Sequence, residues 1–308
     1  MHSKILQLLL SCDGITAAMV PKEKETWLFE ISAKRKLIEF NFKEIWRYRD
    51  LLMLFVKRDI TAAYKQTVLG PLWFLIQPLF TSVIYTLVFN NIANISTGVV
   101  PSFLFNLVGV TAWSYFAFAL NTTSLTFKAN AGMFGKVYFP RFIVPLSKVI
   151  SQLFRFGIQC AILACFYLYY VFYQNIPIAP GLYLLLFPVY VILIILYGLG
   201  LGMILSTFTT KYRDISILLS FAMQLLMYLS AVPYPIGELR KKVPEFSWVV
   251  DYNPLAQIVE GMRYSLFATD NLYFSWSGLL WVCLLGIFLF FMGLILFNRT
   301  EKTFIDTV

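Results

Sequence analysis

Long apolar stretches alternate with short polar segments along this 308-residue chain. Residues 66–127 and 156–210 contain no Asp, Glu, Lys or Arg. A transmembrane helix takes about 20 residues, so each of these stretches is long enough to cross a membrane and return. The pattern predicts an all-α polytopic membrane protein with six transmembrane helices, at residues 72–91, 102–123, 152–173, 182–207, 215–233 and 276–297.

A different pattern precedes the first expected span, where apolar and charged residues recur with helical spacing. A helix with one apolar and one charged side lies along a membrane surface. We therefore expect an amphipathic interfacial helix at residues 34–65, with room for a bend inside it. A surface helix of a soluble domain is the alternative, and the apolar run from Leu72 argues against it. The apolar side consists of Ile45, Tyr48, Leu51, Leu52, Phe55 and Val56, and the charged side of Lys43, Arg47, Asp50, Lys57 and Arg58.

Composition and charge agree with a membrane protein and predict its orientation. Hydrophobic residues make up 59% of the chain and charged residues 13%, whereas a soluble domain has about 25% charged residues. The net charge of +9 comes from Lys and Arg in residues 1–70, in alternate loops and in the tail, while residues 92–101 and 174–181 have none. The positive-inside rule places both termini in the cytoplasm. Because these charges are spread over many loops, they do not indicate nucleic-acid binding.

Four segments follow from these patterns. We expect a poorly ordered cytosolic extension at residues 1–33, the interfacial helix at 34–65, a six-span transmembrane domain at 66–300 and a cytosolic tail at 301–308. The apolar run at residues 5–10 is too short for a cleavable signal. In the external segment 234–274, Asn253-Pro254 is typical of a helix start. One or two short helices that dip into the outer leaflet are expected there, and an ordinary loop packed on the span ends is the alternative.

Most site chemistry can be excluded from the residues available. The only histidine is His2, and the four cysteines have no CxxC spacing. A phosphate-binding loop requires GxxxxGK[ST], and Gly135-Lys136 is followed by Val137. Ion-coupled carriers place acidic residues inside their spans, and the expected spans contain none. We therefore expect no catalytic residue, metal or cofactor in this chain.

Four sequence segments carry a resemblance to a known family. They are RDLLMLFVKRDITAAYKQTVLGPLWFLIQPLF (residues 49–80), FGKVYFPR (134–141), TKYRDI (210–215) and YNPLAQIVEGMRY (252–264). In this order and spacing they resemble the membrane subunit of bacterial polysaccharide ABC exporters, the permeases that move O-antigen of lipopolysaccharide, teichoic acid and capsule polymers. The resemblance covers roughly residues 35 to 300, and KQTVLGPLW is its most specific part.

The resemblance implies several partners. It implies a homodimer in the cytoplasmic (inner) membrane of a bacterium, surrounded by membrane lipids, with an undecaprenyl-diphosphate-linked glycan as its substrate. It also implies a separate ABC ATPase subunit, which binds the ATP and docks on the interfacial helix and on residues 124–148. The alternative is that the charges of these segments only fix membrane orientation. The candidate coupling residues are Arg47, Arg58, Lys128, Lys136 and Arg141.

Polar residues inside the expected spans suggest a substrate path. Positions four residues apart form a slowly winding stripe on a helix, and such stripes occur in the first and fifth spans. Under the resemblance they line the glycan path, and the alternative is that they hydrogen-bond to each other between packed helices. Arg155, with Gln152 and Gln159, either snorkels to lipid headgroups or contacts the lipid-linked diphosphate. The stripes consist of Trp73, Gln77, Thr81 and Tyr85, and of Ser216, Ser220, Gln224 and Tyr228.

Two further functions remain as alternatives to polysaccharide export. One is an ABC permease for a small lipid or drug, and the other is a membrane-embedded glycosyl- or acyltransferase. Such a transferase would need a compact cluster of His, Asp or Arg, which the sequence does not show. The aromatic content of 18% favours a sugar substrate, although Phe also suits a lipid-facing surface.

Overall fold

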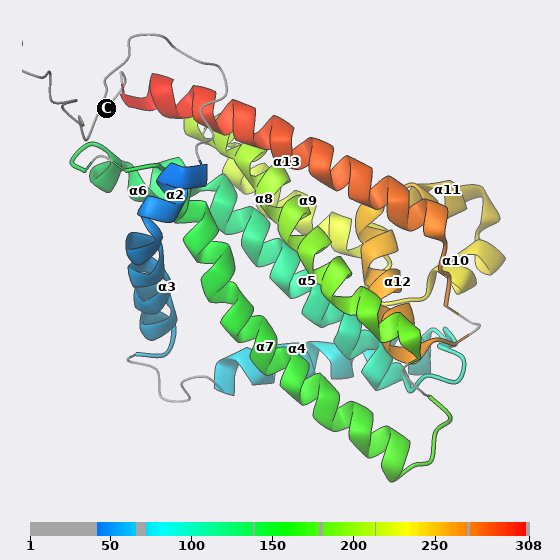
Figure 1. Cartoon of the computed structure of the whole chain (residues 1–308). Coiled ribbons are helices and arrows are strands. Elements are labelled where there is room, and N and C mark those ends of the chain that lie inside the picture. Colours follow the sequence, from blue (N-terminus) through cyan, green and yellow to red (C-terminus); the bar gives the residue numbers. More distant parts are fainter. Residues whose placement is uncertain are drawn as a thin grey trace, which may run out of the picture. The chain divides into compact units, whose positions relative to one another are not determined.

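The computed structural model describes residues 42–65, 72–137, 139–178, 181–212, 214–269 and 272–305, all within one compact unit, Leu37–Val308 (Figure 1). The expected extension at 1–33 and the first residues of the interfacial helix, 34–41, lie outside the described residues. Within the described ranges the chain forms α-helices, one π-helical segment and short 3-10 helices, with no β-strand. The all-α prediction is confirmed over this part of the chain.

Five of the described helices are long and apolar enough to cross a membrane. The sixth expected span corresponds to α9 (Ile215–Leu229), whose 15 residues extend for about 22 Å, less than the ~30 Å hydrocarbon core of a bilayer. The five long helices are α4 (Trp73–Tyr85) with the π-helix η2 (Thr86–Ile92), α5 (Ser102–Ser124), α7 (Ile143–Phe172), the 3-10 helix η3 (Leu182–Leu186) with α8 (Phe187–Lys211), and α13 (Trp276–Ile305).

Several helix ends differ from the predicted span boundaries; α9 ends at Leu229 and not at 233, and α13 continues to Ile305 and not to 297. The third span was expected to begin at residue 152, but α7 begins at Ile143. The basic residue Lys148 suggested a loop there, yet its Nζ lies 2.9 Å from a carboxylate oxygen of Asp59 on α3. Lysine is compatible with a helix, and this ion pair attaches the first turns of α7 to α3. The segment expected as the loop 124–148 also contains a helix, α6 (Thr126–Phe134).

The interfacial segment forms two helices, α2 (Phe42–Arg47) and α3 (Arg49–Tyr64), on either side of Tyr48. The predicted apolar residues do lie on one side of these helices. That side contacts protein, because α3 packs along α7. Large apolar side chains on another side, those of Trp46, Met53 and Leu54, are the exposed ones. Phe55 and Val56 are buried, and Ile45, Tyr48, Leu51 and Leu52 pack against the core.

Helix α8 is packed between α5 and α13. Its glycines alternate between these two neighbours: Gly198 and Gly202 face Ala119 and Thr123 of α5, and Gly200 faces the backbone of α13. Small residues allow transmembrane helices to approach closely. The run of alternating glycines thus explains why α8 can contact two helices at once.

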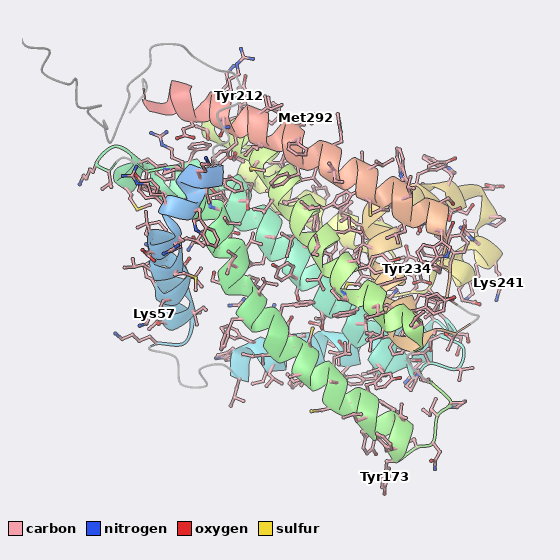
Figure 2. All side chains as sticks on the ribbon, in the orientation of Figure 1. Lys57, Tyr173, Tyr212, Tyr234, Lys241 and Met292 are labelled. Carbon is pink, nitrogen blue, oxygen red and sulfur yellow. The ribbon has the colours of Figure 1, made fainter. Side chains whose placement is uncertain are left out.

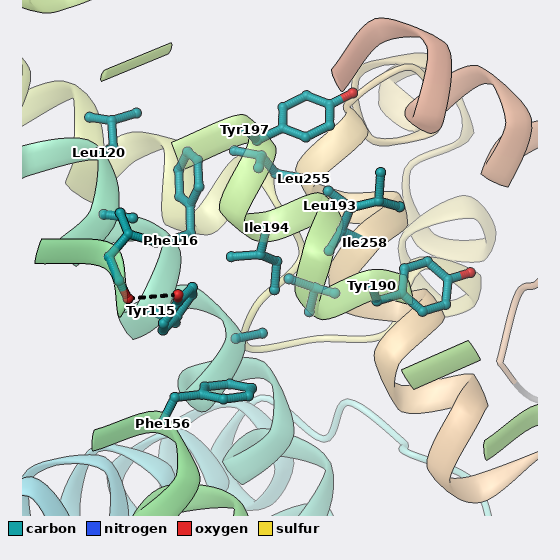
Figure 3. Packing of buried hydrophobic residues seen from close by; sticks show 14 of the residues in the cluster. Tyr115, Phe116, Leu120, Phe156, Tyr190, Leu193, Ile194, Tyr197, Leu255 and Ile258 are labelled. Atoms are coloured by element: carbon teal, nitrogen blue, oxygen red, sulfur yellow. Dashed lines mark hydrogen bonds between the residues drawn. The ribbon is translucent and has the colours of Figure 1, made fainter. Parts of the chain in front are cut away.

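Aromatic residues fill the core between α5, α7, α8 and α12 (Pro254–Phe267) (Figure 3). Tyr115 and Phe156 pack with ring centroids 5.1 Å apart. The buried Tyr115 hydroxyl donates to the carbonyl oxygen of Val149, 3.1 Å away, and the Tyr197 hydroxyl donates to that of Val282, 2.9 Å away. The polar tips of these side chains are therefore satisfied inside the core.

The external segment contains three short α-helices where one or two were expected. They are α10 (Ile236–Lys242), α11 (Ser247–Asp251) and α12, with the 3-10 helix η4 (Pro244–Phe246) before α11. The predicted helix start is confirmed, since the backbone N–H of Leu255 donates to Asn253 Oδ1 at 2.9 Å. Helix α12 packs on α5 and α8, so it belongs to the core of the unit.

A buried ion pair lies within α12, and its arginine also contacts other elements. Arg263 Nη1 lies 3.2 Å from Glu260 Oε2, and both side chains are at most 1% exposed. Burial raises the pKa of Glu260 and lowers that of Arg263 to about 10, and the ion pair opposes both shifts. Arg263 also donates to the carbonyl oxygens of Phe105, Ala231 and Val232. From sequence these two residues were placed among the charges of an external segment, and the structure shows them buried instead.

The connections fall at two opposite ends of the long helices (Figure 1). Helices α2, α3 and α6 and the C-terminal end of α13 lie at one end, and α10, α11 and the N-terminal end of α13 lie at the other. Lys57 marks the first end and Lys241 the second (Figure 2). Helix α13 therefore ends at the same end of the unit as α2 and α3.

Candidate functional site

Pro78 interrupts the backbone hydrogen bonding of α4 at a point where this helix lines a cavity. Proline has no N–H, so the carbonyl of Phe74, four residues earlier, loses its partner within the helix. Gln159 of α7 donates from Nε2 to this carbonyl oxygen at 3.3 Å. Ser114 Oγ of α5 lies 3.4 Å from Gln159 Oε1 and donates to it. Gln159 thereby joins three spans beside the cavity.

The first cavity has a volume of about 360 Å³ and lies between α4, α5 and α7. Helix α9 adds a single lining residue, Met227. Amides, hydroxyls, aromatic rings and one cation are therefore gathered within a membrane-spanning region. The polar lining comes from Gln77, Thr81, Ser114, Gln152, Arg155 and Gln159, and the aromatic lining from Phe74, Trp113 and Phe118.

A second cavity of about 290 Å³ adjoins the first. It lies between the last turns of α3, which contribute Asp59 and Ala63, and α7, which contributes Lys148 and Ser151. Both cavities are lined by Phe74, Phe118, Gln152 and Arg155. These four residues therefore form the wall that the two cavities share.

Arg155 is the cation of the shared wall. Its guanidinium carbon lies 3.9 Å from the ring centroid of Phe74 and 5.6 Å from that of Phe118. Among the described residues no carboxylate forms an ion pair with it. The neighbouring Lys148 is paired with Asp59, which also contacts Arg58 at 3.1 Å. The shared wall thus carries a net positive charge, and the guanidinium that bears it contacts the faces of two aromatic rings.

The predicted stripe of α4 divides along its length. Gln77 and Thr81 line the first cavity with Arg155. Trp73 is 51% exposed, whereas Tyr85 is buried and donates its hydroxyl to Met227 Sδ at 3.1 Å. The structure therefore brings only the middle of this stripe to the cavity.

The predicted stripe of α9 lies outside both cavities. Ser220, Gln224 and Tyr228 are exposed, and Ser216 is partly buried in the first turn. The two stripes approach each other through Phe89 of η2, whose ring lies 5.7 Å from that of Tyr85 and 6.4 Å from that of Tyr228. The hydroxyls of Thr81 and Ser220 donate within their own helices, to the carbonyl oxygens of Gln77 at 2.9 Å and Ile217 at 2.7 Å.

The five candidate coupling residues occupy two kinds of environment. Arg47, Lys128 and Lys136 are exposed, and the side chain of Arg58 is 48% exposed. Arg141 is buried, and its Nη1 donates to the carbonyl oxygen of Glu301 at 2.8 Å. Burial lowers the pKa of Arg141, and the Glu301 carboxylate opposes that shift. The first four lie on the surface, and Arg141 attaches to the end of α13.

Several residues of the site were not predicted. Three aromatic residues lie in apolar runs: Phe74, Trp113 and Phe118. The sequence around them does not indicate whether their rings line a cavity or face lipid. Pro78 was a usable signal, because a proline inside a span frees the carbonyl four residues earlier. The Glu260–Arg263 ion pair could also have been predicted from the sequence. Opposite charges three residues apart are neighbours on a helix, and these two come after the apolar residues Leu255 and Ile258 of the expected helix.

These features define a class of protein, a multi-pass helical membrane protein with a polar cavity among its spans. Residues 50–267 match the ABC-2 type transporter family, and the chain belongs to this family. Permeases of this family pair with an ATPase subunit, and the permease domain itself has no nucleotide-binding site. The sequence resemblance is confirmed at this level.

Curated relatives point in the same direction. The chain is 28% identical over 258 residues to the "O-antigen export system permease protein RfbA" of Klebsiella pneumoniae, covering 83% of this chain and 94% of the relative. It is 25% identical over 217 residues to a protein of the same name from Myxococcus xanthus, covering 70% of this chain and 80% of that one.

Proposed function

We propose that this chain is the membrane subunit of an ABC transporter that exports a lipid-linked polysaccharide across the cytoplasmic membrane of a bacterium. The cavity between α4, α5 and α7 is the observation that carries the proposal. Its amides suit sugar hydroxyls, and its aromatic rings offer flat apolar faces to the C–H groups of a pyranose. The relatives named as O-antigen export permeases support the same substrate class. A separate ATPase subunit supplies the energy.

The proposal includes six crossings with both ends in the cytoplasm. Helix α8 ends at Lys211, and α9 begins four residues later at Ile215. Its other end is fixed beside α12, because Asn253 Nδ2 donates to the carbonyl oxygen of Leu229 at 3.0 Å. This course supports a sixth crossing by a helix that is shorter than the others. The basic residues at the α6 end support a cytoplasmic position for that end.

The proposal also includes a homodimer whose glycan path runs between α4 and α9. Polar groups in hydrocarbon are costly unless they meet protein or water. Ser220 and Gln224 are nevertheless exposed on α9, next to the large exposed side chains of Phe221 and Leu225. A second subunit would cover the apolar side chains and enclose the polar ones. The proposed path residues are Trp73, Gln77, Thr81, Tyr85, Ser216, Ser220, Gln224 and Tyr228, of which Tyr85 is buried within the single chain and could line the path only after a rearrangement.

The exposed basic residues at the α6 end are the proposed contact with the ATPase. Arg47, Arg58, Lys128 and Lys136 come from α2, α3 and the region of α6. Arg141, held by the end of α13, would act by positioning the connection between α6 and α7.

Deletion of the chain in its host tests the proposed function. We expect surface polysaccharide to fall and lipid-linked polymer to accumulate inside the cell, with both restored by the wild-type chain. Normal surface polymer in the deletion strain, together with loss of transport of a small lipid or drug, would support the alternative permease function.

A further inference from the structure

We propose that the second cavity binds the phosphate groups of an anionic lipid, with Arg155 as the residue that holds them. This inference rests on the proposed function, because the lipid would be the carrier of the glycan. It adds the place where the carrier is bound, the side from which it arrives and the residues that recognise it.

The charge of the cavity is the first argument. Lys148 is neutralised by Asp59, the one carboxylate among the described lining residues. Arg155 has no such partner among the described residues and lies seven residues further along α7, about 10 Å along the helix axis. An ionised side chain inside a span is costly and marks a functional position. A phosphate group would supply the missing negative charge, and guanidinium binds phosphate through two parallel hydrogen bonds.

The apolar surroundings are the second argument, and they favour a lipid over a soluble phosphate. Ile60 and Ala63 of α3 and Phe154 of α7 line the cavity, and Phe154 is 49% exposed. Ala62 and Ala63 are small and exposed, which leaves the space between α3 and α7 open. An acyl or prenyl chain could lie along this opening while its phosphate reaches Arg155.

The shared wall gives the site a further property. In the structure the Arg155 guanidinium lies on the Phe74 ring, between the two cavities. A guanidinium on a ring face keeps its N–H donors free at its edge, so Phe74 could support Arg155 while the N–H groups bind a phosphate in the second cavity. The first cavity, lined by Gln77, Gln152 and Gln159, adjoins this position and could take the sugar attached to the phosphate.

Protection of a cysteine at Ser151 tests this proposal. Ser151 lines the second cavity, and its hydroxyl bonds only within its own helix, to the carbonyl oxygen of Lys148 at 2.8 Å. The four native cysteines would be replaced first, and the permease with its ATPase subunit would be placed in lipid nanodiscs. The rate of labelling by a thiol reagent is then measured with polyprenyl diphosphate, with polyprenyl alcohol and with inorganic diphosphate.

At a concentration about ten times its Kd we expect polyprenyl diphosphate to slow labelling about tenfold, because only the unoccupied cavity admits the reagent, and the other two compounds to have little effect. Arg155→Gln should abolish protection, and Arg155→Lys should keep part of it because the charge remains while the paired hydrogen bonds are lost. Lys241→Gln, at the opposite end of the spans, should behave as the parent protein does.

Equal protection by polyprenyl alcohol, or full protection in Arg155→Gln, would overturn the proposal. Equal protection by inorganic diphosphate would overturn the lipid assignment in favour of a soluble phosphate. Loss of protection in Lys241→Gln would also contradict it. Failure here is distinct from failure of the proposed function, because polymer export by the wild-type chain is measured separately in the deletion strain.

Discussion

Arg263, whose charge is balanced by Glu260 on the same helix, joins α12 to α5 and to the segment after α9 through hydrogen bonds with backbone carbonyls. Glu260→Gln would leave the Arg263 charge buried without its counter-ion, at a cost of about 3–5 kcal/mol. We therefore expect a markedly lower melting temperature in detergent for this variant.

Glu238→Gln is the matched control. Glu238 also pairs with a cation three residues later, Lys241, but the Lys241 side chain is 74% exposed. Surface pairs contribute about 0–1 kcal/mol, so this variant should melt close to the wild type. Equal destabilisation by the two substitutions would contradict the role given to the buried pair.

Gly200 and Gly157 allow a second comparison between single residues. A Cβ atom at Gly200 would lie 2.8 Å from the backbone nitrogen of Phe290, whereas a Cβ at Gly157 would have no neighbour within 4 Å. Gly200→Ala should destabilise the chain by about 1–3 kcal/mol through overpacking. Gly157→Ala should be neutral or stabilising, because alanine favours the helix. Thermal unfolding of both variants checks this, and equal effects would speak against close packing of α8 on α13.

At the scale of helices, the first turns after span 2 offer a test of ATPase docking. Lys128→Glu with Lys136→Glu reverses two exposed charges near α6. Loss of charge complementarity should weaken association with the ATPase subunit about tenfold, without affecting membrane insertion. Co-purification of the two subunits measures the effect.

The control for this double variant is Lys241→Glu with Lys242→Glu on α10, two exposed lysines at the opposite end of the spans. It should leave ATPase association unchanged. Arg141 is left out of the test, because its buried contact with Glu301 would confuse docking with stability. Normal association of the Lys128 and Lys136 variant would favour the alternative in which these charges only orient the chain.

The sequence predicted the helices well where apolar length alone decides. The starts of two helices were predicted correctly, Ser102 for α5 and Trp276 for α13. A proline precedes the first of them, and a charged segment precedes the second. The start of α7 was missed because Lys148 is neutralised by Asp59, a residue distant in sequence. The burial of α12 was missed for the same reason, since the carbonyls that satisfy Arg263 come from other elements.

The candidate site could be predicted only in part. Arg155, Gln77 and Thr81 were singled out as polar residues within spans, and they line one cavity. These side chains lie close together because of the way α4, α5 and α7 pack. The spacing of polar residues along a single helix gives no information on that packing. The exposed position of Gln224 was not predicted either, because a polar residue in a span was expected to meet protein or a cavity. In the single chain, one side of α9 is not covered by other helices.

At the scale of the whole molecule, membrane orientation can be tested by labelling. Cysteines placed at Asn175 and Lys241 should react with an impermeant thiol reagent from outside, and those at Lys136 and Lys211 should not. All four positions are exposed, whereas Thr97 in the first external loop is buried and unsuitable. Reaction at Lys136 from outside would contradict the six-crossing arrangement.

Transport into inverted membrane vesicles tests the central claim most directly. Vesicles holding the permease with a cysteine at Gln77 and its ATPase subunit would receive lipid-linked glycan on their outer, cytoplasmic surface. The account predicts that ATP makes the glycan resistant to an added glycosidase, and that a bulky thiol reagent at position 77 prevents this. Glycan that stays fully sensitive in the presence of ATP, or export that persists after proven modification of position 77, would contradict it.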